Sequence, residues 1–137
     1  MKVAFNLSSL AYSTSGIART NLNYLLNIKV PKKEIKLFSF SKIKSSKLKK
    51  FDDIIYFSSI PLRYLNFIWY NFVLPFQLYF NNVDYLISHH RSPILNIGFK
   101  SILFVHDFTW KKVPETMKYS NYLLEKYFTP ISIKRAQ

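Results

Sequence analysis

The sequence predicts an α/β protein whose Rossmann-like parallel sheet of about five strands is flanked by helices. Short strand-like segments alternate with longer segments of helical periodicity, which is typical of successive β-α-β units. The segment 102–105 is a short run of bulky and β-branched residues, which favours a strand buried on both faces, as in a parallel sheet. These two observations fix the fold class before any motif is considered.

The length and composition are those of one folded domain. The chain has 137 residues, of which 49% are hydrophobic and 18% aromatic, too apolar for a disordered chain. With no cysteine, neither disulfides nor thiolate metal sites are available, which suits a reducing compartment. Lys2 leads directly into a strand-like segment without a secretory leader, so we expect a cytoplasmic protein.

A net charge of +13 points to anionic partners such as nucleic acid, acidic lipid or a phosphorylated substrate. The aromatic residues lie in apolar runs rather than between basic ones, so nucleic acid is not expected. Positions 29–50 contain one acid, Glu34, and nine lysines: Lys29, Lys32, Lys33, Lys36, Lys42, Lys44, Lys47, Lys49 and Lys50. This lysine cluster predicts either a solvated basic surface or contact with an anionic membrane, the protein then lying peripherally on its inner face.

Strand patterns occur at 2–7, 34–40, 53–57, 83–88 and around 101–107. Helical periodicity occurs at 17–28 and 117–128, and Pro130 breaks or kinks the second of these before 131–137. The intervening segments 8–16, 42–50 and 108–114 are expected to be a small polar loop, a basic connector and a loop, with Pro114 opening the last helical region.

The segment 62–80 is the most unusual of the chain because it is apolar almost all round. Its polar residues Arg63, Asn66, Tyr70 and Gln77 fall in one row of a helical projection. Such a helix is either buried or in contact with a membrane. Its polar residues and Pro75 argue against a membrane span, and we expect it to pack on the sheet.

Two places along the chain carry residues suited to chemistry. His106 and Asp107 follow a predicted strand, and the carboxyl ends of parallel strands form the ligand crevice of open α/β sheets; a local hydrogen bond or helix cap is the plainer alternative. Gly16 permits close backbone approach where a small-residue loop meets a helix, with Thr14 or Ser15 as cap, and this is a potential anion site. Adjacent His89 and His90 would face opposite ways on a strand, so that pair predicts no metal site.

Several short patterns then follow one another in a recognisable order. They are Ser15-Gly16-Ile17-Ala18-Arg19, Leu74-Pro75, the segment 83–89, Phe104-Val105-His106-Asp107, Val113-Pro114-Glu115 and Ile133-Lys134-Arg135-Ala136. Their order and spacing resemble the amino-terminal half of family 4 glycosyltransferases, which have the GT-B fold. The resemblance covers almost the whole chain, although the family often has two glycines where this chain has Ser15-Gly16.

The resemblance implies the acceptor-side domain of a retaining glycosyltransferase, which transfers a sugar from a nucleotide-sugar to a glycan or lipid-linked acceptor without a metal or other cofactor. It implies that His106, followed by Asp107, lies at the catalytic cleft and contacts the transferred sugar. It also implies a substrate-binding role for Ser15, Gly16, Ile17, Arg19 and His89.

The family helix that ends near Ala136 normally continues into further strands and a carboxyl-terminal donor domain. We therefore expect residues 1–137 to form one incomplete amino-terminal domain that is inactive by itself and is completed by a donor-domain chain. The alternative is a non-enzymatic module that binds a membrane periphery or a protein partner through the lysine cluster and the aromatic segment 62–80.

Overall fold

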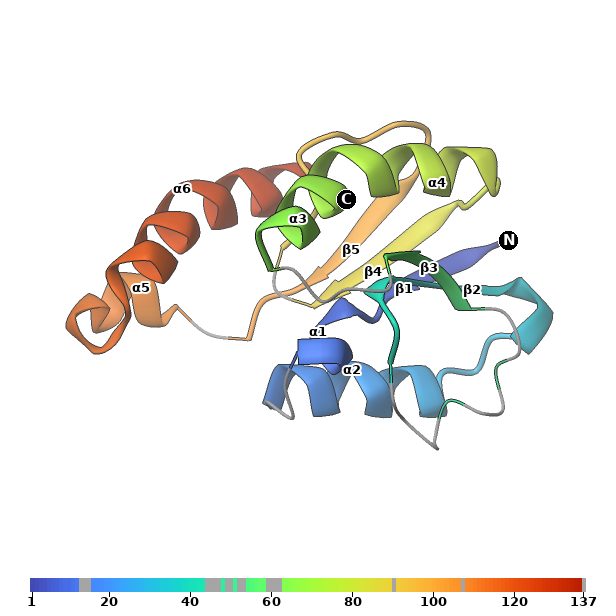
Figure 1. Cartoon of the computed structure of the whole chain (residues 1–137), viewed down its shortest axis with the longest axis horizontal. Coiled ribbons are helices and arrows are strands. Elements are labelled where there is room, and N and C mark those ends of the chain that lie inside the picture. The colour runs from blue at the N-terminus through green and yellow to red at the C-terminus, as the bar shows by residue number, and fades with distance from the viewer. Residues whose placement is uncertain are drawn as a thin grey trace.

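The computed structural model describes residues 1–12, 16–43, 48, 51, 54–58, 63–89, 91–106 and 108–136. It confirms the predicted fold class, with five parallel strands in the order β3-β2-β1-β4-β5 and helices on both faces (Figure 1). The strands are β1 (Val3–Asn6), β2 (Ile35–Ser41), β3 (Ile54–Ser58), β4 (Tyr85–His89) and β5 (Lys100–Phe104). Each strand begins within two residues of its predicted start.

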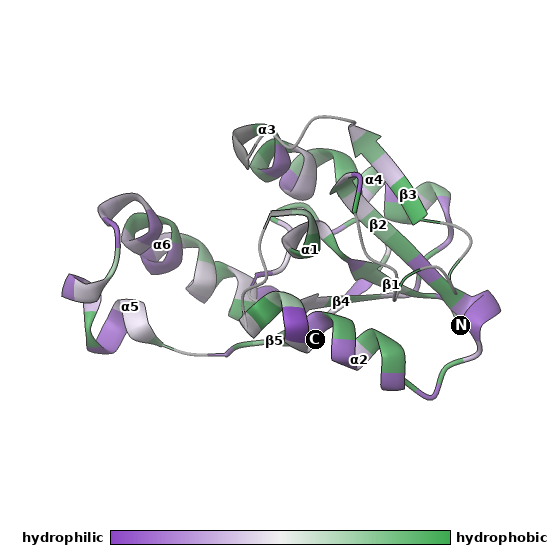
Figure 2. Ribbon diagram, turned by 60° about the horizontal axis from the view of Figure 1, so that its bottom comes forward, coloured by the Kyte–Doolittle hydropathy of each residue, from purple (hydrophilic) through white to green (hydrophobic). Residues whose placement is uncertain are grey.

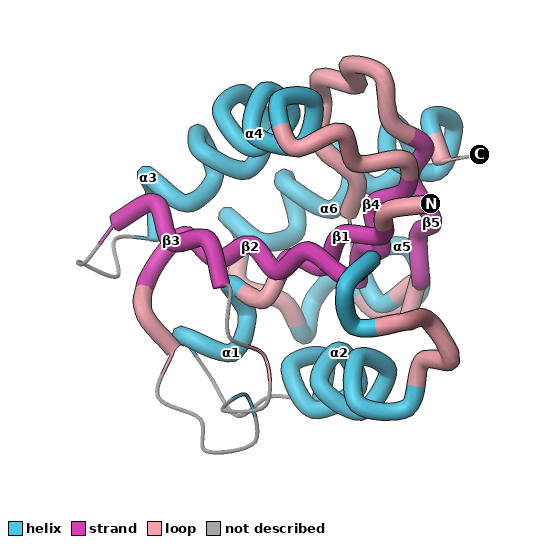
Figure 3. Tube along the Cα trace, turned by 90° about the vertical axis from the view of Figure 1, so that its right-hand side faces the viewer, coloured by secondary structure: helices cyan, strands magenta, loops and turns pink. Residues whose placement is uncertain are grey.

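The helices form a layer on each face of the sheet (Figures 1 and 3). One layer consists of α1 (Ser8–Tyr12) and α2 (Gly16–Asn27). The other consists of α6 (Tyr119–Arg135) and a continuous helical stretch made of α3 (Arg63–Ile68), the π-helical segment Trp69–Val73 and α4 (Leu74–Phe80). Short helical turns at Lys32–Glu34, Thr109–Lys112 (α5) and Pro114–Thr116 complete the described elements.

The central strands are buried on both faces, and their side chains alternate between two cores. Val3 and Phe5 of β1 pack with Leu25 of α2, whereas Ala4 packs with Trp69 and the α4 side. Figure 2 accordingly shows much of β1 and β2 in the green of hydrophobic residues. This alternation follows from the two-residue period of a strand, and burial on both faces explains why the strands read as near-continuous apolar runs.

The strand order creates a switch point between β1 and β4. From β1 the chain moves outward to β2 and β3, and it then returns to β4 on the other side of β1. The connections after β1 and β4 therefore diverge, which leaves a crevice at their carboxyl ends. Asn21 of α2 supports this edge by donating a hydrogen bond from Nδ2 to the carbonyl oxygen of Asn6, at 2.7 Å.

The expected loops at 8–16 and 108–114 are wrong in part, because α1 occupies Ser8–Tyr12 and α5 occupies Thr109–Lys112. The backbone N–H of Ser8 donates to Asn6 Oδ1 at 3.0 Å, and Ser8 Oγ accepts from the N–H of Phe40 at 2.9 Å. A side-chain bond at the helix start and a bond to β2 thus stabilise a turn that local composition did not suggest. The proposed caps Thr14 and Ser15, and most of the 42–50 connector, lie outside the described residues.

The expectation that the strand in 102–105 is buried on both faces is also wrong. β5 lies at the edge of the sheet, and the side chain of Ile102 is 39% exposed. Ile102 pairs in register with Ile87, which belongs to the core beneath α2. The α2 layer covers Ile87 but leaves its neighbour Ile102 open on the same face, so the apolar run predicted a strand correctly but not its position in the sheet.

The helical stretch 63–80 packs on the sheet, as expected, and does so with Trp69, Leu74 and Leu78 in the core. No helix in the described part of the chain has both the length and the apolarity to cross a bilayer. Its polar side chains point inward: Asn71 Oδ1 accepts from the N–H of Ile94 at 3.1 Å, and the Tyr70 hydroxyl bonds Ser88 and the Arg91 carbonyl. These bonds attach the irregular connection between β4 and β5 to the helical stretch.

The last helix, α6, begins at Tyr119 and continues through Pro130 to Arg135, so Pro130 does not end it. Its buried side carries Glu125, which pairs with Arg91 at 3.2 Å and accepts a hydrogen bond from Thr129. Ser132 Oγ donates to the carbonyl oxygen of Ser92 at 3.2 Å. These polar contacts hold α6 against the connection that follows β4.

Candidate functional site

Two histidines meet at the carboxyl edge of the sheet. His89 is the last residue of β4, and His106 follows β5 by two residues. His89 Nδ1 lies 3.3 Å from His106 Nε2, within hydrogen-bond distance, and the two rings stack with centroids 5.5 Å apart. The structure thus brings together two of the predicted site residues that are 17 positions apart in sequence, next to the switch point.

Aromatic side chains hold His89 in place. Its ring stacks on Phe104, the residue opposite it on β5, with centroids 5.0 Å apart and an interplanar angle of 12°. Tyr24 of α2 meets His89 edge-on at 5.6 Å and Phe104 at 4.6 Å. His106 is exposed, whereas His89 is half-buried, so the pair presents one free imidazole to solvent and one that is held by its neighbours.

One ring nitrogen of His89 has no hydrogen-bond partner among the described residues. Nδ1 faces His106, while Nε2 is buried and unpaired. Burial, and to a lesser extent the charge of His106, lowers the pKa of His89 to about 4, so its ring is neutral near pH 7. A neutral imidazole has one donor and one acceptor nitrogen, so His89 Nδ1 can either donate to His106 Nε2 or accept from it.

The amino terminus of α2 supplies the other predicted site residues. α2 begins at Gly16, at the end of the sheet where the strands finish (Figure 1). A Cβ built on Gly16 would have no described atom within 4 Å. No described part of the chain therefore packs closely against this glycine. Ile17 is half-buried and Arg19 exposed. Ser15, Asp107 and His90 lie outside the described residues, so their predicted roles stay predictions.

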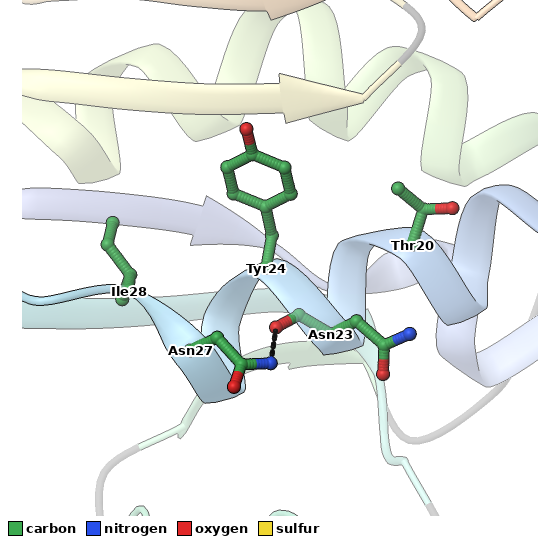
Figure 4. A pocket seen from close by; sticks show the side chains of 5 residues that line it. All are labelled: Thr20, Asn23, Tyr24, Asn27 and Ile28. Carbon is green, nitrogen blue, oxygen red and sulfur yellow. Dashed lines mark hydrogen bonds between the residues drawn. The ribbon is translucent and has the colours of Figure 1, made fainter.

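A shallow pocket of about 430 Å³ lies along α2, beside the histidine pair. Figure 4 shows its lining side chains, with the Tyr24 ring standing between α2 and the strands. The lining residues are Thr20, Asn23, Tyr24, Asn27 and Ile28. Tyr24 connects this pocket to His89 through their ring contact. Amide and hydroxyl groups beside an aromatic ring form the kind of surface that binds polar, uncharged ligands.

Sequence reasoning missed Tyr24 and Phe104 as parts of the site. Tyr24 was not singled out within the helical segment 17–28, and Phe104 was interpreted only as part of an apolar strand and of the motif that ends in His106-Asp107. The register between β4 and β5 makes Phe104 the neighbour of His89, and no local pattern reports that register. No group of three or more potential metal ligands occurs among the residues that the structure describes.

The low pKa of His89 should make the free energy of unfolding depend on pH in the acid range. The unfolded histidine titrates near pH 6.5, so between pH 6.5 and 4 the unfolded chain binds a proton that the folded chain does not. Stability should therefore fall as the pH is lowered through this range. We expect a loss of about 1 kcal/mol between pH 7 and 5, which is discounted because the ring is only half-buried.

Denaturant unfolding at both pH values would measure this loss, and NMR titration of the ring Cε1 protons would measure the pKa directly. His89→Gln should remove that part of the pH dependence, and His106→Gln should raise the pKa of His89 only partly, because burial is the larger cause. Titration of His89 near 6.5 in the native chain would contradict the assignment.

Comparison with protein-family models, with curated proteins and with solved structures finds no match.

Proposed function

We propose that this chain is the acceptor-side portion of a retaining glycosyltransferase, which binds a glycan or lipid-linked acceptor and is completed by a nucleotide-sugar-binding domain. The observation that carries the proposal is the pairing of His89 with His106 at the carboxyl edge of a Rossmann-like sheet. Ligands of open α/β sheets bind at this edge. The motif resemblance adds to this support, since it implies that His106 lies at the cleft and that His89 has a substrate-binding role.

In the proposed reaction, charge develops on the leaving phosphate and on the sugar ring. α2 begins at the site edge, where the positive end of its helix dipole stabilises negative charge. The open space above Gly16 lets a phosphate approach this backbone. His106 is exposed and hydrogen-bonds a sugar hydroxyl, while neutral His89 fixes the orientation of the His106 ring.

An acceptor-binding experiment tests the proposal without requiring turnover. A panel of mono- and oligosaccharides and a short-chain lipid-linked sugar would be titrated into the chain while the histidine Cε1 protons are followed by NMR. We expect saturable shifts at both His89 and His106 with at least one sugar, and at least tenfold weaker binding in His106→Ala. Lys32→Gln is the matched control and should bind normally, because Lys32 precedes the amino end of β2 and the proposed site lies at the carboxyl ends of the strands.

Transfer assays would accompany the titration. The chain alone should transfer no sugar from any nucleotide-sugar, because positioning of donor and acceptor in one cleft supplies much of the rate. Adding a donor domain should produce transfer. The proposal would be overturned if the chain bound no sugar. It would also be overturned if the chain alone transferred sugar and His106→Ala abolished that transfer.

A further inference from the structure

In the helical stretch 63–80, polar side chains face the protein interior and apolar side chains face solvent, the reverse of an ordinary surface helix. Between residues 65 and 80 the polar side chains of Asn71 and Gln77 turn inward, where Gln77 Oε1 accepts from Trp69 Nε1 at 2.9 Å. All exposed residues between 65 and 80 are instead apolar or aromatic. They are Leu65, Ile68, Phe72, Phe76, Tyr79 and Phe80, with exposed fractions between 44% and 75%, and together they form what we call the outer face.

This outer face is long, continuous and free of charge. Its members recur at the spacing of one helix side, from the first turn of α3 to the end of α4. Scattered single exposed apolar residues are ordinary on proteins, but a contiguous stripe marks an interaction site. On the inward side, Asn71 bonds the β4–β5 connection, and Gln77 bonds Trp69.

The neighbouring helix in the same layer is basic. α6 lies on the same face of the sheet as α3 and α4 (Figure 3), and Phe67 meets Phe128 of α6 with ring centroids 5.4 Å apart. The exposed charged side chains of α6 are all positive: Lys126, Lys134 and Arg135. Its single acid, Glu125, is buried against Arg91. This side of the molecule therefore combines apolar and cationic groups.

A hollow of about 470 Å³ lies between the end of α6 and the β4–β5 connection. Lys134 and Arg135 line it from α6, and Ile94, Leu95 and Asn96 line it from the β4–β5 connection. The N–H of Leu95 lies 3.4 Å from the carbonyl oxygen of Asn71, so this connection also contacts the helical stretch whose opposite side is the outer face. Two cations with an amide in a concave site fit the phosphate of a lipid headgroup.

We propose that the outer face and the Lys134–Arg135 hollow form the surface by which this protein binds an anionic phospholipid bilayer. The phenylalanines enter the headgroup and acyl boundary, as the apolar sides of interfacial helices do, and the hollow holds a lipid phosphate. Charge favours this occupant over a second copy of the chain, because two copies would each carry +13. The inference is independent of the glycosyltransferase proposal.

Vesicle co-sedimentation tests it, with phosphatidylcholine vesicles that contain either no or 30% phosphatidylglycerol. We expect binding to the anionic vesicles that weakens as salt is raised. Replacing both Phe76 and Phe80 by Ser should weaken binding by at least about tenfold. Lys134→Gln with Arg135→Gln should weaken it by a similar factor. These side chains are exposed, so the melting temperature should stay within a few degrees of the native value.

The matched comparison is Lys32→Gln with Lys33→Gln, which removes the same charge from the turn before β2. These two residues belong to the lysine cluster, the other membrane contact predicted from the sequence, and lie outside the outer face and the hollow. This variant should bind almost normally. Equal loss in this variant would show that net charge alone attracts the protein, and would overturn the proposal. Unchanged binding after the Phe76 and Phe80 replacements, or no binding to anionic vesicles, would also overturn the proposal. A dimer that these replacements dissociate would overturn it too, because the outer face would then bind a second copy of the chain.

Discussion

Replacing Trp69 with alanine should lower the free energy of unfolding by about 3–5 kcal/mol, a large part of the 5–15 kcal/mol typical of a domain. Trp69 is only 1% exposed and lies in the core between the π-helical segment and the sheet, with its ring centroid 5.9 Å from that of Phe40. The change would leave a cavity and would also leave Gln77 Oε1 without its donor. Denaturant unfolding at pH 7 would measure the loss.

Phe72→Ala is the matched control, because Phe72 belongs to the same helical stretch but lies on the outer face. Its loss should stay within about 0.5 kcal/mol, as for most surface positions. Similar losses for the two variants would contradict the inward and outward assignment on which the membrane surface depends. Trp69→Phe should recover most of the stability, since it restores much of the buried ring.

Removing the His106 imidazole should reduce sugar transfer by at least about 10²-fold once the chain is combined with a donor domain, an effect typical of a positioned imidazole. His106 is exposed and contacts His89 at 3.3 Å, so the side chain contributes little to the core. His106→Ala should therefore leave the melting temperature nearly unchanged. Steady-state transfer rates and thermal unfolding of the same preparations would separate the two effects.

His106→Asn serves as the conservative comparison, because its amide can replace one hydrogen bond of the imidazole but cannot take up a proton near neutral pH. Partial recovery of the rate in this variant would indicate that His106 positions a hydroxyl group. Normal transfer by His106→Ala, or a melting temperature far below that of the native chain, would show instead that the residue is structural.

Local sequence patterns predicted the five strands and α2, whereas α1 and α5 were expected to be loops. The five strands occur where alternating or continuous apolar runs predicted them, because the pattern of a strand depends only on residues that are adjacent in sequence. The helix α2 and the packing of 63–80 on the sheet were likewise predicted from periodicity. The resemblance directed attention to His89 and His106, while Ser15 and Asp107 lie outside the described residues, so their roles stay predictions.

The contacts between distant residues, and the side of each element that is covered, could not be predicted from local patterns. The contact of His89 with His106 depends on β4 and β5 being neighbours in a particular register, and the exposure of Ile102 depends on β5 lying at the sheet edge. The inward side of 65–80 bonds the β4–β5 connection through Tyr70 and Asn71. Each of these outcomes joins residues distant in sequence, and their free energies come from packing and buried hydrogen bonds that no local pattern records.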